Sequence, residues 1–276
     1  SDDTNTDPPT RAFRDGVSID AQASGSAVVM QSSNVGHAKV IYVDEDNENG
    51  GDATGRPDGS IVGTVINERF FGGPGADWYM MSVPVDVKYR EFLMDASDEF
   101  FFGETLGGAS RSRLWIQGPA NSDASDSGVQ ANGNENLFFY DETDDSPFVS
   151  VTEGGGDQSW TMVPDVENQI GPGEGFLVYA FSDEFRDGTA TGFPKTLEAR
   201  GTPLNSLDFT FPVTYTDNTG SENSLTADDQ GWNLVGNPYQ TNLNWGATSG
   251  WTKTNMSSTI YIYDPQNNEY KSNNGS

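Results

Sequence analysis

The chain has 276 residues, of which 34% are apolar, and its 42 acidic side chains outnumber the 14 lysines and arginines to give a net charge of −28. The absence of cysteine excludes a disulfide framework, a thiol nucleophile and a cysteine-ligated metal, and a single histidine, His37, excludes a multi-histidine metal site. A nucleic-acid partner is also excluded, because phosphate binding needs a concentrated basic surface that the sequence lacks.

Short segments rich in β-branched and aromatic residues follow one another along the chain, separated by Gly, Pro, Asn and Asp. Residues 1–14 precede them and are typical of a polar linker or disordered leader. The segments predicted as strands are 26–31, 38–44, 60–71, 78–85, 112–117, 136–141, 175–181, 207–216, 232–237 and 259–264. Only 87–100 has a helical pattern, and no run of 18 apolar residues predicts a membrane span. The sequence therefore predicts an all-β, sandwich-like protein.

Acidic side chains are concentrated in the turn at 44–52, which contains Asp44, Asp46, Glu48 and Asp52. Carboxylates spaced two apart on a curled loop converge, as they do in calcium loops. The segment departs from the EF-hand pattern, because its glycine falls one place late and no Glu closes the loop. Calcium is the one cofactor that these residues indicate, but the sequence favours a solvated acidic turn over a calcium loop here. The overall acid excess favours a surface adapted to a salty medium, where salt screens carboxylate repulsion.

Two segments of the chain share one plan. Residues 77–87 (DWYMMSVPVDV) align with residues 231–241 (GWNLVGNPYQT), so that Trp78 matches Trp232. Each segment is typical of a buried strand that a tryptophan opens and that a small residue and a proline end. We therefore expect Trp78 and Trp232 to occupy equivalent buried positions.

The likeness continues downstream of both segments. Residues 137–150 and 260–272 each contain an aromatic strand, an acidic turn and a return strand that begins at Phe148 or Tyr270. This order predicts two hairpins. A glycine-rich turn and an apolar strand at 170–181 follow the first hairpin only.

The repeat predicts two related antiparallel sandwich-like units, at 15–190 and 191–276, of which the second lacks its closing strand. An incomplete unit of this kind would expose a sheet edge, and such an edge invites pairing. Either a continuation of the polypeptide or a strand from a neighbouring subunit would close it.

The stretch GWNLVGNPY (231–239), followed by LNW and TIYIYD, resembles a module of large secreted and surface proteins of Bacteroidetes-type bacteria. Many proteins of this kind are exported by the type IX secretion system. Residues 59–85 and 170–178 are similar to segments that accompany the module there. The resemblance implies an extracellular, cell-surface β protein and carries over no catalytic residue. Family members that have a C-terminal sorting domain carry it after the module, so we expect a trimmed or partial chain.

The sequence leaves three functions open. A glycoside hydrolase needs two carboxylates a few ångströms apart, but with 42 acids some such pair always exists, so the acids do not indicate catalysis. A carbohydrate-binding module would stack sugars on aromatic faces, for which the candidates are Trp115, Trp160, Trp245 and Trp251. A structural or adhesive surface protein needs only strands, solubility and partner surfaces. The sequence favours this last, non-catalytic function, in an extracellular adhesin or filament subunit that binds copies of itself, other surface proteins or polysaccharide.

Overall fold

The structure is a computed structural model. The residues that it describes are 12–13, 19–21, 28–30, 32–33, 36–37, 41–42, 61–71, 77–94, 114–121, 135–143, 160–181, 195–204, 209–217, 231–240, 243–247, 251–264, 267 and 269–274.

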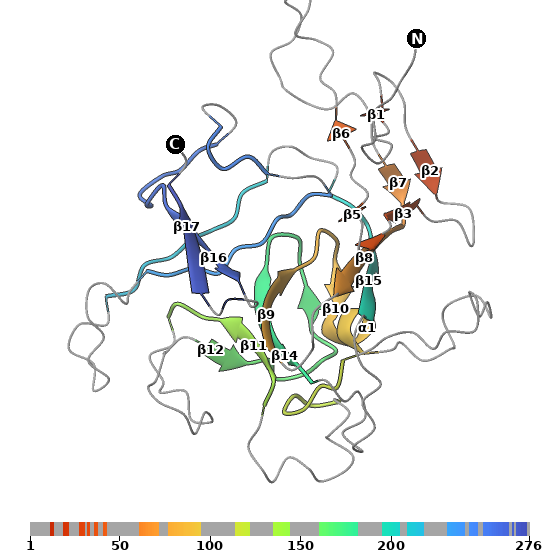
Figure 1. Cartoon of the computed structure of the whole chain (residues 1–276), viewed down its shortest axis with the longest axis horizontal. Coiled ribbons are helices and arrows are strands. Elements are labelled where there is room, and N and C mark those ends of the chain that lie inside the picture. The colour runs from red at the N-terminus through yellow and green to blue at the C-terminus, as the bar shows by residue number, and fades with distance from the viewer. Residues whose placement is uncertain are drawn as a thin grey trace, which may run out of the picture.

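Strands dominate the described residues, and the chain is an all-β protein with one short helix (Figure 1). In chain order the elements are β1 Ala12–Phe13, β2 Ile19–Ala21, β3 Val28–Met30, β4 Ser32–Ser33, β5 Gly36–His37, β6 Ile41–Tyr42, β7 Ile61–Gly63, β8 Val65–Phe71, β9 Asp77–Ser82, β10 Val87–Lys88, α1 Tyr89–Leu93, β11 Leu137–Tyr140, β12 Trp160–Met162, β13 Gln169–Ile170, β14 Gly175–Ala180, β15 Lys195–Gly201, β16 Ile260–Asp264 and β17 Glu269–Asn273.

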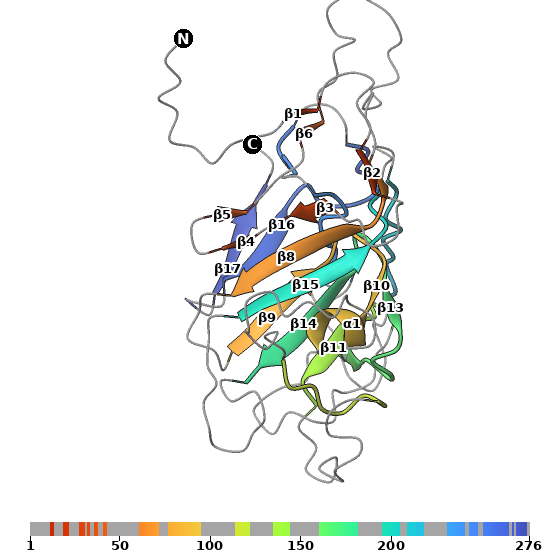
Figure 2. The same ribbon diagram turned by 90° about the vertical axis from the view of Figure 1, so that its right-hand side faces the viewer.

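Two sheets form the centre of the molecule. The larger has the strand order β12-β11-β14-β9 and is antiparallel throughout, whereas the smaller, β15-β8-β3, combines an antiparallel and a parallel pair. Figure 2 shows β8 and β15 running beside β9 and β14. The remaining strands pair two by two, as β1-β6, β2-β7, β4-β5, β10-β13 and β16-β17.

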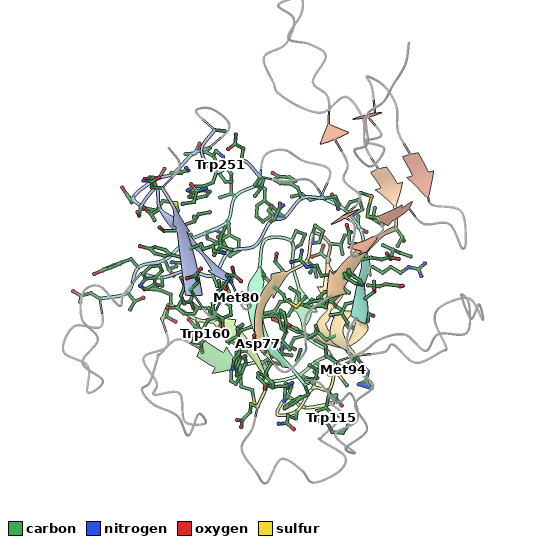
Figure 3. The ribbon with its side chains drawn as sticks, viewed as in Figure 1. Asp77, Met80, Met94, Trp115, Trp160 and Trp251 are labelled. Carbon is green, nitrogen blue, oxygen red and sulfur yellow. The ribbon has the colours of Figure 1, made fainter. Side chains whose placement is uncertain are left out.

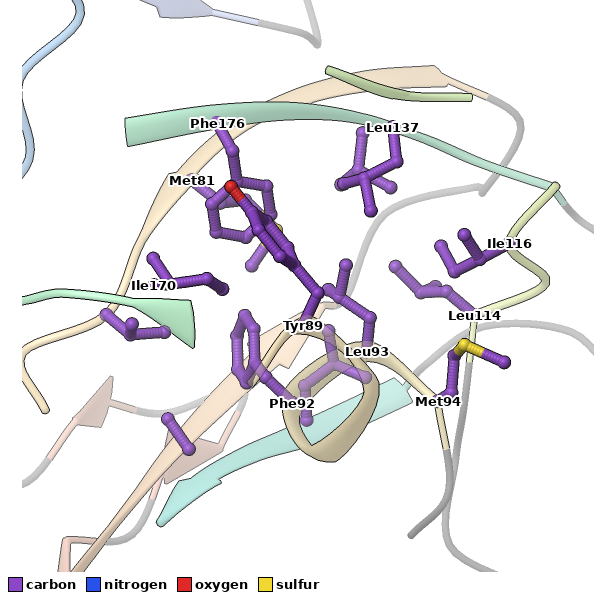
Figure 4. Packing of buried hydrophobic residues seen from close by; sticks show 14 of the residues in the cluster. Met81, Tyr89, Phe92, Leu93, Met94, Leu114, Ile116, Leu137, Ile170 and Phe176 are labelled. Carbon is purple, nitrogen blue, oxygen red and sulfur yellow. The ribbon is translucent and has the colours of Figure 1, made fainter. Parts of the chain in front are cut away.

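Side chains from both central sheets enter one hydrophobic core. Strand β14 buries alternate residues, so Phe176 and Val178 point inward, and Leu197 on β15 joins them. This is the period of two that a strand with one buried face requires. Helix α1 adds Tyr89, Phe92 and Leu93, which Figure 4 shows projecting into the cluster around Phe176.

Helix α1 is shorter than the predicted helical segment, 87–100, of which residues 95–100 lie outside the described part. Val87 and Lys88 form β10, which pairs with β13, so the helix begins only at Tyr89. It ends where Met94 adopts an extended backbone and the Leu93 carbonyl accepts a hydrogen bond from the Leu114 amide at 2.8 Å.

Three segments predicted as strands form no ladder in their described residues: 114–117, 209–216 and 232–237. Asparagine side chains take the place of a neighbouring strand for two of them. The Asn136 side chain accepts from the Gln117 amide and donates to the Trp115 carbonyl. The Asn233 side chain accepts from the amide of Thr214 and donates to its carbonyl. These predictions were wrong because an extended, apolar segment becomes a strand only beside a suitable partner.

The hairpin predicted at 260–272 is confirmed, with Tyr263 paired opposite Tyr270. Strand β11 of the predicted first hairpin pairs with β12 on one side, where Trp160 lies opposite Tyr140, and with β14 on the other, so neither edge is left for the predicted return strand. The return strand predicted to begin at Phe148 falls outside the described residues.

Pairing and core contacts cross the predicted boundary between the two units at residue 190. Strand β15 follows the predicted boundary at residue 190, yet it pairs with β8 and buries Leu197 and Ala199 in the main core. Residue Val235 forms an antiparallel bridge with Glu174 at the start of β14. The division into two sandwich-like units stays a prediction.

Candidate interaction surface

The C-terminal part of the chain has exposed large apolar side chains. Elsewhere in the described chain, large apolar side chains are buried or half-buried. The core cluster ends at Ala199, and none of its members comes from the described residues that follow. The exposed set lies entirely within 213–270 and consists of Val213, Tyr215, Trp232, Val235, Leu243, Met256, Tyr261, Ile262 and Tyr270. Because concentrated exposed apolar surface marks interaction sites, we take this region as the candidate site.

The β16-β17 hairpin has two chemically different faces. Side chains alternate along each strand, and directly paired residues lie on the same face. The register therefore places Tyr261, Tyr263, Tyr270 and Ser272 on one face, which we call the tyrosine face. The opposite face, which we call the charged face, consists of Ile260, Ile262, Asp264, Glu269, Lys271 and Asn273.

Aromatic contacts extend the tyrosine face beyond the hairpin. The Tyr263 and Tyr270 rings lie 5.3 Å apart, and the Tyr261 ring lies 5.1 Å from Trp232 in an edge-to-face arrangement. The exposed fractions are 45% for Trp232, 50% for Tyr261 and 59% for Tyr270. The prediction that Trp232 is buried like a core residue is therefore wrong. Its matched residue, Trp78, is half-buried and packs on Phe138 and Tyr179.

The inner end of the tyrosine face lies beside β9. Partial burial raises the pKa of Tyr263, and the nearby carboxylate of Asp77, at the start of β9, adds to this effect. Figure 3 marks Asp77 and Met80 of β9 next to the hairpin. The face therefore begins against the central sheet and extends outward to Tyr261 and Tyr270.

Charge on the charged face is locally compensated. The Lys271 ammonium pairs with Asp264 and lies 3.9 Å from Glu269. The hydrogen bond to Asp264 raises the pKa of Lys271, so this side chain stays protonated. Exposed pairs of this kind contribute little to stability, but here they hold Asp264, Glu269 and Lys271 together on the charged face.

Two of the predicted sugar-stacking residues, Trp245 and Trp251, are brought together. Their ring centroids are 4.8 Å apart, and the Lys253 ammonium lies 3.9 Å from the centroid of Trp245. Both indole N–H groups donate to carbonyls of the same loop, Trp245 to Ser258 at 2.5 Å and Trp251 to Asn244 at 2.8 Å. The pair therefore holds its own loop together, and Lys253 covers part of one ring face by a cation–π contact worth about 0.5–1 kcal/mol.

The other two predicted residues lie apart from this pair. Trp115 is half-buried beside Gln117, and Trp160 is half-buried edge-on against Tyr140 in the large sheet. Figure 3 places Trp115, Trp160 and Trp251 in separate parts of the molecule. The structure does not assemble the four tryptophans into one site.

The proposed calcium residues Asp44, Asp46, Glu48 and Asp52 lie outside the described residues, so calcium stays a prediction. Within the described part, no group of three or more His, Asp or Glu side chains is arranged to hold a metal. His37 lies in β5, opposite Ser32 of β4. No described helix could cross a bilayer, since α1 has only five residues.

A glycine-lined contact attaches the C-terminal region to the main core. The Gly236 amide donates to the Gly173 carbonyl at 2.7 Å, beside the bridge between Val235 and Glu174. A Cβ on Gly236 would lie 2.1 Å from the Ser82 Cβ, and one on Gly175 would lie 2.5 Å from Leu234. We call the contact between Leu234–Gly236 and Ser82, Gly173 and Gly175 the glycine seam. The small residues are needed because the two backbones meet there.

Glu142 and Gln240 attach the same region at two further points. The buried Glu142 carboxylate accepts hydrogen bonds from the backbone amide and the hydroxyl of Thr216. The buried Gln240 side chain donates to the Pro84 carbonyl at 3.2 Å. Tyr215 and Trp232 are therefore carried on segments attached to the core.

Sequence reasoning missed the tyrosine face, although the sequence contains a signal for it. Residues 231–263 include no Asp or Glu, in a chain with 42 such residues among 276. The stretch is instead rich in Asn, Thr, Ser, Trp and Tyr. A long acid-free stretch in so acidic a chain indicates a surface with a different role.

No protein family, no curated protein and no solved structure matches this chain. The resemblance of 231–239 to a module of bacterial surface proteins stays a prediction.

Proposed function

We propose that the chain is a non-catalytic extracellular surface protein with a structural or adhesive role, and that residues 213–270 carry the surface by which it attaches to other macromolecules. One observation carries the proposal: every exposed large apolar side chain of the described chain lies within these residues. Patches of this kind mark interaction surfaces in soluble proteins. The resemblance of 231–239 to a surface-protein module supports the extracellular location.

If the protein forms a fibre, its copies would assemble by pairing strands with one another. The hairpin is a two-stranded sheet with exposed Ile262 and Tyr270, and two strands alone make a marginal sheet. An added strand from another copy would cover such a hairpin and supply main-chain hydrogen bonds. In salty medium the repulsion between two chains of net charge −28 is screened, which permits this contact.

The test is the association state of the intact chain. We expect sedimentation velocity in about 1 M NaCl, where the Debye length is about 3 Å, to show assemblies that grow with protein concentration. Ile262→Asp should weaken them, because it places a charge on exposed apolar surface. Thr202→Asp, at an exposed position outside the region, is the control. A chain that stays monomeric and adsorbs to neither protein-coated nor polysaccharide-coated surfaces would overturn the proposal.

Carbohydrate binding is the second candidate function. It is favoured by the exposure of Trp232, Tyr261 and Tyr270, because ring-bearing side chains with a polar group suit ligands that are partly apolar and partly hydroxylated.

A further inference from the structure

We propose that the tyrosine face, together with Trp232, binds a neutral polysaccharide by stacking sugar rings on its aromatic side chains. The inference rests on the proposed attachment function and names the partner of that surface.

The aromatic groups form a row of two contacting pairs. Trp232 contacts Tyr261 with ring planes at 68°, and Tyr263 contacts Tyr270 with ring planes at 52°. Tilted pairs leave ring surface uncovered, in agreement with the large exposed fractions of Trp232, Tyr261 and Tyr270. A sugar ring has an apolar C–H face that stacks on such rings and a hydroxyl rim that hydrogen-bonds to polar groups beside them. Ser272, opposite Tyr261, adds an exposed hydroxyl on the same face.

Charge distribution on the hairpin indicates that the ligand is uncharged. All three charged side chains of β16 and β17, Asp264, Glu269 and Lys271, lie on the charged face, so the hairpin itself places no charge on the tyrosine face. The carboxylate of Asp77 lies near the inner end of this face, beside Tyr263. The acid-free stretch 231–263 supplies Trp232 and two of the three tyrosines. A site for an ionic ligand would present a complementary charge, and the outer part of this face, at Tyr261 and Tyr270, has no charged side chain of the hairpin.

The net charge of the chain favours a neutral polymer over the other candidate partners. A second copy brings its own −28 charges and can approach only where salt screens them, and an anionic polymer is repelled in the same way. A neutral polysaccharide meets no such repulsion and can approach the only acid-free surface of the hairpin. The amphipathic aromatic face, to which the hairpin contributes no charged side chain, therefore favours a neutral, hydroxyl-rich polymer over a protein or a nucleic acid.

Depletion binding with the full chain tests this inference. The probes are two insoluble neutral polysaccharides, microcrystalline cellulose and starch granules, with an alginate gel as the anionic comparison. We expect the chain to bind at least one neutral probe and not alginate, with an association constant that changes less than about twofold between 0.1 and 1 M NaCl, because no charges are paired. Tyr261→Ser and Tyr270→Ser should each weaken binding about tenfold, whereas Tyr261→Phe should retain it.

The matched control is Lys271→Ser. Lys271 is adjacent to Tyr270 and its side chain is 59% exposed, but it lies on the charged face and outside residues 213–270, so polysaccharide binding should be unchanged. Circular dichroism shows whether each variant is folded. If a serine variant does not fold, Tyr261→Phe still tests whether an aromatic ring at this position is enough for binding. Self-association that depends on Tyr261, without binding to either neutral probe, would overturn this inference and leave the proposed function standing. A wild-type chain that neither self-associates nor binds a polysaccharide would overturn both this inference and the proposed function.

Discussion

Single polar side chains decide where the backbone of this protein goes when no strand is available to pair with it. Asn136 is 1% exposed, and its amide joins three segments by bonding the Gln117 amide and the carbonyls of Trp115 and Tyr179, at 2.7–2.9 Å. The Asn233 side chain bonds both the amide and the carbonyl of Thr214 in the same way, at a more exposed position. The Asn136 amide is valuable because the backbone groups that it bonds are wholly or partly shielded from water.

Asn136→Ala should therefore lower the free energy of unfolding by about 2–4 kcal/mol, because it leaves three buried or partly buried backbone groups without that partner. Urea unfolding monitored by tryptophan fluorescence measures the loss. Asn168→Ala, at an exposed position, should change stability by less than about 0.5 kcal/mol. A loss below about 1 kcal/mol for Asn136→Ala would contradict the role given to this side chain.

At the scale of elements, the glycine seam explains how segment 231–240 is attached to the central sheet without a full strand ladder. Ser82 and Gly236 occupy matching places in the two aligned sequence segments, and the structure brings the two residues into contact. Both positions carry small residues because the end of β9 and segment 231–240 approach each other there. The similarity between the segments is therefore accompanied by a direct contact, while their environments differ: β9 is a six-residue strand, and segment 232–237 has a single bridge.

Gly236→Ala should loosen the seam, because the added methyl group would lie 2.1 Å from the Ser82 Cβ. Gly236 does not have a positive φ, so the effect would come from the clash and not from backbone strain. Overpacking of this kind costs about 1–3 kcal/mol, so we expect amide exchange at Gly236 to accelerate by about tenfold or more. Ser82→Gly combined with Gly236→Ala removes the clash and should restore slow exchange. Equal exchange in all three proteins would show that the seam does not hold the segment.

At the scale of the whole molecule, a main core and an exposed C-terminal surface are combined in a strongly acidic chain. The core unites both central sheets and α1, whereas residues 213–270 hold the exposed apolar side chains. The net charge of −28 keeps the chain soluble and opposes compactness through repulsion between carboxylates. Stability and association should therefore both depend on salt.

Lowering NaCl from about 1 M to about 0.01 M extends the Debye length from about 3 Å to about 30 Å, so the carboxylates repel one another more strongly. We expect the melting temperature to fall by at least about 4 °C, which corresponds to about 1–2 kcal/mol for a chain of this size. Differential scanning fluorimetry measures the shift. At fixed ionic strength, a chelator should lower the melting temperature only if calcium is bound at Asp44, Asp46, Glu48 and Asp52. A melting temperature indifferent to salt would argue against the repulsion.

Local residue patterns and turns in the sequence specify the β class, the apolar strand that became β14 and the hairpin at 260–273. The sequence did not determine whether 112–117, 207–216 and 232–237 pair, because a ladder depends on which segment lies alongside. Nor did it determine that Trp232 is exposed. Burial of a tryptophan depends on what covers it. The hydrophobic core is built from residues before 201, and segment 231–240 contributes no residue to it. The separation of aromatic and charged side chains on the hairpin is encoded in the sequence, but the cross-strand register was needed to see it.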